Sequence, residues 1–550
     1  MARPQRRVGL LFLFGLILLS GVLLRAFWLQ GVQGNSLASQ AASQQVATVT
    51  VPGLRGAILD RNGQELAGSE EGASIYATPY QIKDPQTESE AVAKALDADP
   101  NDVLKAITAP GGFSYVQRKV DLAHSTKVEE LGLEGIGQHP DTIRTRPQGP
   151  LAGQLIGAVS EDGKGLTGLE LGEDSTLHGV DGERQLVNDA LGDPISLKTL
   201  TDAQDGAPIK LTIDASVQAE AEKVLAEVGA THDPVNASAI VMDTRTSQVL
   251  AMASWPPVDL DDLGNATTDQ LLNLGTGYNF EPGSTFKAFT VASALESGTV
   301  SPSSSFALPP SIQVADRVIE ESHPRPTLTL SVGDILAQSS NVGAVTIGLK
   351  MGGRSFSKWI NKFGFGKPTG IEYPGEEQGL VLPYDEYSGS TMGNLPIGQG
   401  ISVTPIQMIQ AYGALANGGI LRRPQLIEKI GDQEVAPDPG KRVISPEVAS
   451  EVRTMLEGVL APGGTASEVS VPGYTLAGKT GTAQIATEDG YSDSQYVASF
   501  MGIAPAQNPA VAISVIVNQP QNGHVGGEVA APAFGELASF VLPYLGVPTE

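Results

Sequence analysis

The sequence begins with a long apolar run. No charged residue occurs from Val8 to Leu24, and the apolar character resumes after a single arginine. A helix that crosses a bilayer needs about 20 such residues, and arginines before the run favour a cytoplasmic N-terminus. We therefore predict a cytoplasmic tail over residues 1–7 and one transmembrane anchor over residues 8–29, with the rest of the chain outside the cytoplasm. A cleaved signal peptide is the alternative, since small residues suitable for cleavage lie between Gln33 and Ala42.

The next part of the chain changes from polar to mixed. Residues 30–50 are rich in Gln, Ser and Ala, and we interpret them as a stalk. Residues 51–200 mix short strand and helix patterns, which predicts an elongated α+β domain without a large apolar core. Its opening segment, RGAILDRNGQELA (Arg55–Ala67), predicts a β-hairpin with a type I′ turn at Asn-Gly. Further on, we predict a closely packed helix over Gly149–Val159 and a glycine-rich loop over Gly165–Gly172.

Residues 201–550 have the pattern of an α+β domain, with an antiparallel sheet flanked by helices. We predict strands at Lys210–Asp214, Ala237–Asp243, Gln248–Ser254, Gln495–Ala504 and Val511–Gln519, and helices at Ala215–Val228, Thr404–Asn417, Ser445–Leu460 and Pro532–Leu545. The strands near the two ends of this region would share one sheet that the terminal helices cover. Residues 302–326 are rich in proline and are expected to be mostly loop.

A further helix, predicted over Glu281–Gly298 (EPGSTFKAFTVASALESG), carries candidate chemistry. A Pro-Gly turn opens directly into it and places Ser284 at the helix start, where backbone N–H groups favour a nearby anion. Lys287 lies one turn later on the same face. Because the helix is otherwise almost wholly apolar, burial would lower the pKa of Lys287 and make it a base for the Ser284 hydroxyl. The alternative is a capping serine followed by a surface lysine, and the same spacing recurs at Ser355–Lys358.

Composition narrows the chemistry. The chain has 550 residues, which is too long for one core, and its net charge of -26 leaves no basic surface for nucleic acid. It contains no cysteine, so disulfides and thiolate metal sites are excluded. The six histidines form no short ligand pair. We therefore expect no nucleic-acid partner, no metal and no cofactor.

Two later patterns supply what acyl transfer at a serine still requires, which is a proton path and further polar groups for the substrate. Ser339 and Asn341 form a Ser-x-Asn pattern, and Lys479–Thr482 (KTGT) reads as a strand whose bare backbone at Gly481 would let a ligand come close. Singly these patterns also fit a helix cap and an edge strand. Each occurs once, after Ser284 and in this order, which is the triplet of the penicillin-recognising serine acyltransferases. The repeat at Ser355 falls out of order.

On these motifs the chain resembles the class B penicillin-binding proteins, the monofunctional transpeptidases of bacterial cell-wall synthesis. The resemblance covers nearly all of the chain after the anchor, with the hairpin segment matching the opening motif of the family's pedestal or dimerisation domain. The later matching segments are GLTGLE, YNFEPGSTFKAFT, QSSNVG, FGFGKPTG, GQGISVTPIQM, GGTA and AGKTGTAQ. It implies a penicillin-recognising serine transpeptidase fold over residues 201–550, preceded by the pedestal domain over residues 51–200.

Two details bear on the subtype. Glu281, before the PGSTFK motif, and the compact pedestal are more similar to the division-type, FtsI-like members than to the elongation type. Arg146 departs from the family pattern, because an aromatic residue is usual before the following proline. This puts a local pedestal contact in doubt, but not the active site.

The resemblance also implies a role for each motif residue. Ser284 would be the nucleophile that forms an acyl-enzyme with the penultimate D-alanine of a stem peptide, and Lys287 would be its general base. Ser339 and Asn341 would relay a proton and position the substrate, while Lys479 would supply positive potential. Which group moves each proton is not decided by the sequence.

Substrate binding would fall to the KTGT strand. The hydroxyls of Thr480 and Thr482 would bind the substrate's terminal carboxylate, with Gly481 between them. The backbone N–H groups of Ser284 and Thr482 would form the oxyanion hole.

The implied partners are peptidoglycan stem peptides on lipid-linked precursor glycan strands, β-lactam antibiotics, a SEDS-type glycan polymerase and other divisome membrane proteins. The implied location is the cytoplasmic membrane. An elongation-type transpeptidase, a β-lactamase, a D-Ala-D-Ala carboxypeptidase and a non-catalytic penicillin-binding scaffold are the alternatives that share these motifs.

Overall fold

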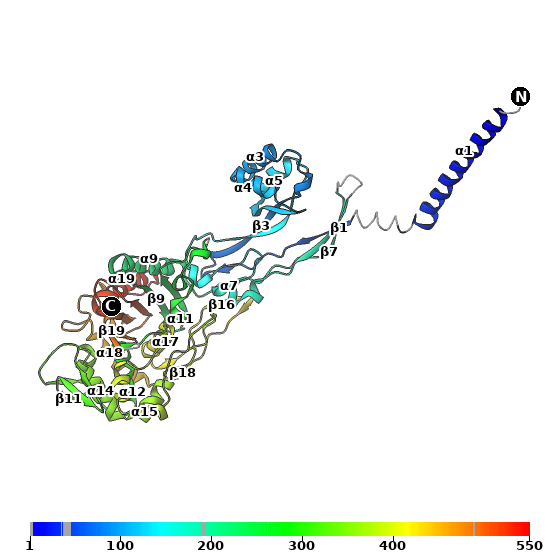
Figure 1. Ribbon diagram of the computed structural model, residues 1–550. Coiled ribbons are helices and arrows are strands. Elements are labelled where there is room, and N and C mark those ends of the chain that lie inside the picture. Colours follow the sequence, from blue (N-terminus) through cyan, green and yellow to red (C-terminus); the bar gives the residue numbers. More distant parts are fainter. Residues whose placement is uncertain (1–3, 35, 37–45, 189–193, 261, 488–489) are drawn as a thin grey trace. The chain divides into compact units, whose positions relative to one another are not determined.

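The computed structural model describes residues 4–34, 36, 46–188, 194–260, 262–487 and 490–550 (Figure 1). Helix α1 (Pro4–Phe27) comes first and continues as one π-helical segment, η1 (Trp28–Val32). The helical stretch Arg7–Val32 is long and apolar enough to cross a membrane, in agreement with the predicted anchor. The middle of the predicted stalk, with most of the alternative cleavage region, lies outside the described residues, and its last residues begin strand β1 (Val46–Val51).

The chain divides into two compact units, each built from separate segments. The first comprises residues 1–54, 70–143 and 179–206. It contains an antiparallel sheet in the order β1-β6-β7 and a second group of strands in which β4 and β5 pair with β3. Helices α3, α4 and α5 belong with this second group, around a small apolar core. The bounds are β3 (Glu65–Ala77), β4 (Ser114–Asp121), β5 (Ile136–Thr145), β6 (Gly182–Asn188), β7 (Pro194–Thr201), α3 (Pro85–Leu96), α4 (Pro100–Ile107) and α5 (Leu122–Glu130).

The predicted hairpin in RGAILDRNGQELA is present, but its turn is of another type. β2 (Ile58–Leu59) pairs with the first residues of β3, and the Asp60 N–H donates to the Gln64 carbonyl at 2.8 Å. Within this turn only Gly63 has a positive φ, of 84°, whereas a type I′ turn needs two such residues. The Asp60 carboxylate accepts the N–H groups of Asn62 and Gln64 at 2.7 and 2.8 Å. These bonds fix a type I turn followed by a left-handed glycine, so the type I′ prediction is wrong.

Two other predictions for this part of the chain are also wrong. The segment Gly149–Val159 is helical only over α6 (Gly153–Ile156), and the expected loop at Gly165–Gly172 contains helix α7 (Gly168–Gly172). Gly157 has a φ of 85°, and a Cβ at this position would lie 2.0 Å from a backbone carbonyl oxygen of the α7 segment. The small residues therefore serve the close approach of two backbones rather than the packing of one long helix.

The second unit comprises residues 55–69, 144–178 and 207–550. Its main sheet is antiparallel, with the strand order β10-β9-β21-β20-β19. β9, near the start of this unit, pairs with β21, near its end, so the prediction that the two ends share one sheet is confirmed. The bounds are β9 (Asn236–Asp243), β10 (Val249–Trp255), β19 (Ala477–Thr487), β20 (Gly490–Ala504) and β21 (Val511–Asn518).

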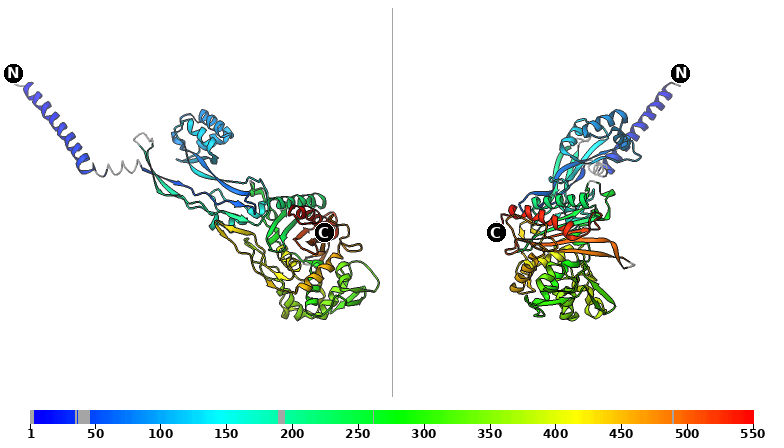
Figure 2. Two further views of the ribbon diagram at one scale, coloured as in Figure 1. Left: turned by 180° about the vertical axis from the view of Figure 1, so that it is seen from behind. Right: turned by 90° about the vertical axis from the view of Figure 1, so that its left-hand side faces the viewer.

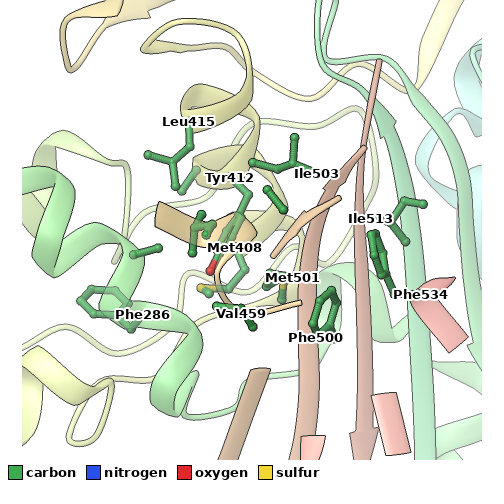
Figure 3. Packing of buried hydrophobic residues seen from close by; sticks show 14 of the residues in the cluster. Phe286, Met408, Tyr412, Leu415, Val459, Phe500, Met501, Ile503, Ile513 and Phe534 are labelled. Atoms are coloured by element: carbon green, nitrogen blue, oxygen red, sulfur yellow. The ribbon is translucent and has the colours of Figure 1, made fainter. Parts of the chain in front are cut away.

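Helices cover both faces of this sheet. α9 (Ala215–His232) and α19 (Gly526–Tyr544) lie side by side on one face (Figure 2), and α17 (Pro405–Ala416) and α18 (Pro446–Glu457) pack against the other. Successive strand residues point to opposite faces, and Phe500 of β20 meets Phe534 of α19 with ring centroids 4.7 Å apart (Figure 3). The predicted helices are thus confirmed, although α19 begins earlier than expected and includes Pro532.

The proline-rich segment 302–326 is more ordered than predicted. It contributes β11 (Ser305–Leu308), which pairs with β14 (Leu328–Ser331), and a hairpin of β12 (Ser311–Val314) with β13 (Arg317–Glu320). Each strand has only four residues, too short for a clear alternating pattern in the sequence. The loop prediction for this segment is therefore wrong.

The remaining elements of the second unit are short or connect those above. A small side sheet runs β17-β16-β8-β2. The bounds are α8 (Asp174–Leu177), β8 (Ile209–Leu211), α10 (Thr268–Leu271), α11 (Leu274–Gly277), η4 (Gly283–Phe286), α12 (Lys287–Glu296), α13 (Val332–Ala337), α14 (Asn341–Met351), α15 (Gly353–Lys362), α16 (Thr391–Asn394), η6 (Leu395–Ile397), β15 (Ile420–Leu421), β16 (Ile427–Ile430), β17 (Gln433–Glu434) and β18 (Lys441–Arg442).

Candidate active site

Ser284 lies in a tight turn that leads into a buried helix. The turn is the 3-10 segment η4, and α12 follows it without a break. Gly283 has a φ of 52°, and its N–H donates to the Gly398 carbonyl at 3.0 Å, so contacts from outside fix the turn. Phe286, at the end of η4, is buried in the core of the domain. The turn therefore holds Ser284 half-buried at the helix start, as the sequence predicts.

Lys287, the first residue of α12, is fully buried. Its Nζ donates to the Ser339 carbonyl at 2.6 Å and to Asn341 Oδ1 at 2.7 Å, and it lies 3.2 Å from Ser339 Oγ. Burial lowers the pKa of Lys287 to about 7, and the nearby negative charge of Glu321 partly opposes this change. The predicted fall in pKa is thus confirmed.

The protonation state of Lys287 determines what its contacts can do. When charged, an ammonium has three donors, one for each of these contacts. When neutral, the amine keeps two donors for the two short contacts and gains a lone pair that can accept a proton. No hydrogen bond joins Lys287 to Ser284 in the described part of the chain, so the amine contacts the Ser339 turn rather than the predicted partner.

The Ser-Ser-Asn motif forms the turn between α13 and α14. Ser339 has a φ of 58°, which is uncommon for a residue with a side chain. Ser340 caps α14, where its hydroxyl accepts the Gly343 N–H at 2.9 Å. The turn brings Ser339 and Asn341 against Lys287, although they are far apart in the sequence.

The KTGT motif lies on β19, the edge strand of the main sheet, next to η4. Lys479 is fully buried, and its Nζ donates to the Thr480 carbonyl at 3.1 Å. Burial lowers the pKa of Lys479 well below its usual value, and the positive charge of Lys287 lowers it further. The two lysines are therefore close enough for each to disfavour the charge of the other.

The two threonines of the motif have different partners. The hydroxyl oxygens of Thr480 and Thr465 lie 2.6 Å apart, and Thr465 belongs to the GGTA segment. The Thr482 hydroxyl accepts the Gly526 N–H, at the start of α19, at 3.0 Å. Both threonines are thus held from a neighbouring segment.

Gly481 has a structural reason different from the predicted one. A Cβ at this position would lie 2.2 Å from Ser499 Oγ and 2.9 Å from the Thr285 side chain. The glycine therefore allows β20 and η4 to close on β19. The space that was expected to admit a ligand is taken by these protein groups, and Gly481 does not line the cavity described next.

A cavity of about 500 Å³ lies over the three motifs. Five of the predicted site residues line it: Ser284, Ser339, Asn341, Thr480 and Thr482. The two buried lysines lie behind this lining. By contrast, the Ser355–Lys358 repeat lies on α15 and does not line the cavity.

Several lining residues have no counterpart in the motifs. The hairpin strand β13 and the residues after it form one wall, and other loops supply the rest: Arg317, Val318, Ile319, Glu320, Ser322, His323, Ile397, Gln399, Gln484, Tyr496, His524 and Val525. The Tyr496 and His524 rings stack with centroids 4.6 Å apart. Only the apolar pair in the middle of β13 is a strand signal in the sequence, and the surrounding prolines obscure it.

The arrangement can perform acyl transfer at a serine. It offers a hydroxyl open to the cavity, an amine that is partly neutral at pH 7, and hydroxyl and cationic groups on a neighbouring strand. Over the described ranges, no cluster of three or more His, Asp or Glu side chains could hold a metal ion.

Comparison with known families gives two matches. Residues 237–539 match the family of the penicillin binding protein transpeptidase domain, and residues 50–211 match the penicillin-binding protein dimerisation domain. Together they span most of the chain after its first helix.

Individual relatives match over nearly the whole length. The chain is 33% identical to penicillin-binding protein PbpB of Mycolicibacterium smegmatis, covering 99% of this chain and 91% of the relative. It is 32% identical to peptidoglycan D,D-transpeptidase FtsI of Escherichia coli, covering 97% and 91%. Among solved structures, penicillin binding protein 3 of Mycobacterium tuberculosis, complexed with aztreonam, matches with a TM-score of 0.72 and 29% identity, covering 91% and 98%.

Proposed function

The chain belongs to the class B penicillin-binding proteins, and on that premise we propose that Ser284 is the nucleophile of its transpeptidase domain. The enzyme is a serine-type peptidoglycan D,D-transpeptidase, which cross-links stem peptides through an acyl-enzyme formed on D-Ala-D-Ala. One observation carries the assignment to Ser284: the three motifs, distant in sequence, meet at a single cavity that Ser284 lines and the Ser355 repeat does not.

The first half of the reaction is acylation. Ser284 Oγ attacks the carbonyl carbon of the penultimate D-alanine, and its proton passes to the neutral amine of Lys287. Ser339 lies in contact with Lys287 and is placed to relay this proton. The bond from the carbonyl carbon to the terminal D-alanine nitrogen then breaks, and D-alanine leaves as an amine after taking up a proton.

The second half of the reaction forms the cross-link. The amine of an acceptor stem peptide attacks the ester carbon of the acyl-enzyme, and the bond to Ser284 Oγ breaks. The acceptor nitrogen loses a proton and the serine regains one, so the enzyme returns to its starting state. Lys287, neutral in about half of the molecules at pH 7, can accept and return this proton.

Substrate binding is assigned to the groups around the nucleophile. The hydroxyls of Thr480 and Thr482 bind the terminal carboxylate, which the buried positive charge of Lys479 attracts. Asn341 positions the substrate amide, and the N–H groups of Ser284 and Thr482 stabilise the oxyanion. Gly481 acts through the shape of β19, since its missing side chain lets η4 approach the strand.

The test is covalent labelling with fluorescent penicillin, whose β-lactam carbonyl stands in for the D-alanine carbonyl. We expect Ser284→Ala to abolish labelling and Ser355→Ala to leave it unchanged, with mass spectrometry placing the adduct on the peptide that contains Ser284. Labelling that survives Ser284→Ala refutes the assignment. The same experiment addresses the alternatives: rapid release of the penicilloyl group indicates a β-lactamase, and release of D-alanine without cross-links indicates a carboxypeptidase. Labelling without either product indicates a scaffold.

We also propose a role in septal wall synthesis and an orientation in the membrane. The chain has one N-terminal apolar helix, as in a single-pass membrane protein. Arginines at its start support a cytoplasmic N-terminus and an extracytoplasmic catalytic domain. The similarity to FtsI supports a division role beside a SEDS-type polymerase and other divisome proteins. Depletion should block septation, whereas loss of cell width or length control would indicate the elongation role.

A further inference from the structure

We propose that Glu321 is a positioning residue of the active site, one that fixes the Ser-Ser-Asn turn against Lys287. The proposal rests on the function proposed above. Glu321 follows β13, and its side chain is only 6% exposed. Its carboxylate accepts the Ser340 hydroxyl at 2.6 Å and the Asn341 N–H at 2.8 Å, and it also binds Arg325. One carboxylate thus holds two consecutive residues of the motif.

Neighbouring contacts fix the rest of Asn341. Its Nδ2 donates to the Glu320 carbonyl at 2.9 Å, while its Oδ1 accepts from Lys287. Both ends of the side-chain amide are therefore engaged, one by the segment after β13 and the other by the base. Because Glu321 fixes the backbone N–H of the same residue, the hairpin strand and the motif form one hydrogen-bonded unit.

The turn needs this support because its first residue is strained. Ser339 has a φ of 58°, and such a conformation persists only when surrounding contacts determine it. The Ser339 carbonyl makes the 2.6 Å contact to Lys287, so relaxation of the turn would move both the base and the hydroxyl beside it. A displacement of about 1 Å in a catalytic group can lower the rate by about 100-fold.

Glu321 also acts on Lys287 by charge. The charged groups that act on this amine are Lys479 on β19 and Glu321, whose own charge is partly balanced by Arg325. Glu321 raises the pKa of Lys287 against the larger effect of burial. A purely structural residue would have no such effect, so the pH dependence of acylation separates the two roles.

The experiment compares three variants of the full-length chain in detergent. Glu321→Ala removes the hydrogen bonds and the charge, and Glu321→Gln removes the charge but keeps an acceptor. Glu296→Ala is the matched control, because Glu296 accepts the N–H and hydroxyl of Ser445, both at 2.8 Å, at the start of α18. The readouts are the second-order rate of acylation by fluorescent penicillin from pH 5 to 9, and the melting temperature.

We expect Glu321→Ala to slow acylation at its pH plateau by about 100-fold, Glu321→Gln to recover most of that loss, and Glu296→Ala to acylate at the wild-type rate. In Glu321→Gln the rise of the rate with pH should shift to lower pH, because the amine loses its nearby negative charge. The proposal is wrong if Glu321→Ala acylates at the wild-type rate, or if the Gln variant keeps the wild-type pH profile. If Glu321→Ala does not fold, the Gln profile alone decides. Labelling of Ser284→Ala would instead refute the proposed function itself.

Discussion

Lys287 should set the pH dependence of acylation. Burial lowers the pKa of this lysine from 10.5 to about 7. With the usual value, only roughly one molecule in 3,000 would carry a neutral amine at pH 7, whereas about half do so with the lowered value. At about 1.4 kcal/mol for each tenfold step, burial thus removes on the order of 4 kcal/mol from the free energy of preparing the base. We expect the acylation rate to rise about tenfold per pH unit up to about pH 7 and then level off.

The assay is the rate of labelling by fluorescent penicillin at sub-saturating concentration, followed from pH 5 to 9.5 on denaturing gels. Circular dichroism at each pH checks that the fold is intact. Lys287→Arg is the informative variant, because a guanidinium keeps its positive charge across this range and cannot act as a base. It should lose at least about 1,000-fold in rate at every pH. A wild-type rate that keeps rising tenfold per unit beyond pH 9 would refute the lowered pKa, and a flat profile would refute the role of Lys287 as base.

Three further predictions concern other parts of the molecule. Gly481→Ala would place a methyl carbon 2.2 Å from a serine hydroxyl of β20, so we expect a lower melting temperature and loss of acylation. Arg55→Met should cost about 3–5 kcal/mol of stability in denaturant unfolding, because it leaves the buried Glu170 carboxylate without a partner 2.5 Å away. The exposed pair of Lys223 is the control, and Lys223→Met should change stability by less than about 1 kcal/mol. Deletion of residues 1–29 should release the protein from membranes, and a deletion variant that still sediments with them would contradict the anchor.

Much of the second unit could be predicted because its elements are long and strongly patterned. The apolar runs of β9 and β21 have the length of buried strands, and Thr404 with the following proline marks the start of α17. The turn at Asp60 shows a limit of such signals. Asn-Gly correctly indicated a hairpin, but the turn type was decided by hydrogen bonds to the preceding carboxylate.

The active site was predictable where chemistry requires a motif and not where it requires only a contact. Ser284, Lys287, Ser339 and the KTGT strand were found from residue type and order. The wall formed by β13 was missed, because four-residue strands among prolines have no clear period and gain stability only after they pair. Glu321 was missed for the same reason: no local pattern distinguishes a carboxylate that will meet a turn many residues later in the chain.

The charges of the site explain how it can attract an anion and also take up a proton. Lys287 and Lys479 are both fully buried, so each ammonium makes the charge of the other less favourable. Glu321, the carboxylate that acts on Lys287, is already paired with Arg325. The empty site therefore favours the loss of one proton, which leaves a neutral base beside a positive potential. A substrate carboxylate bound at the KTGT strand brings the missing negative charge and raises the proton affinity of the nearby amine. Substrate binding thus strengthens Lys287 as a base at the step in which the serine must lose its proton.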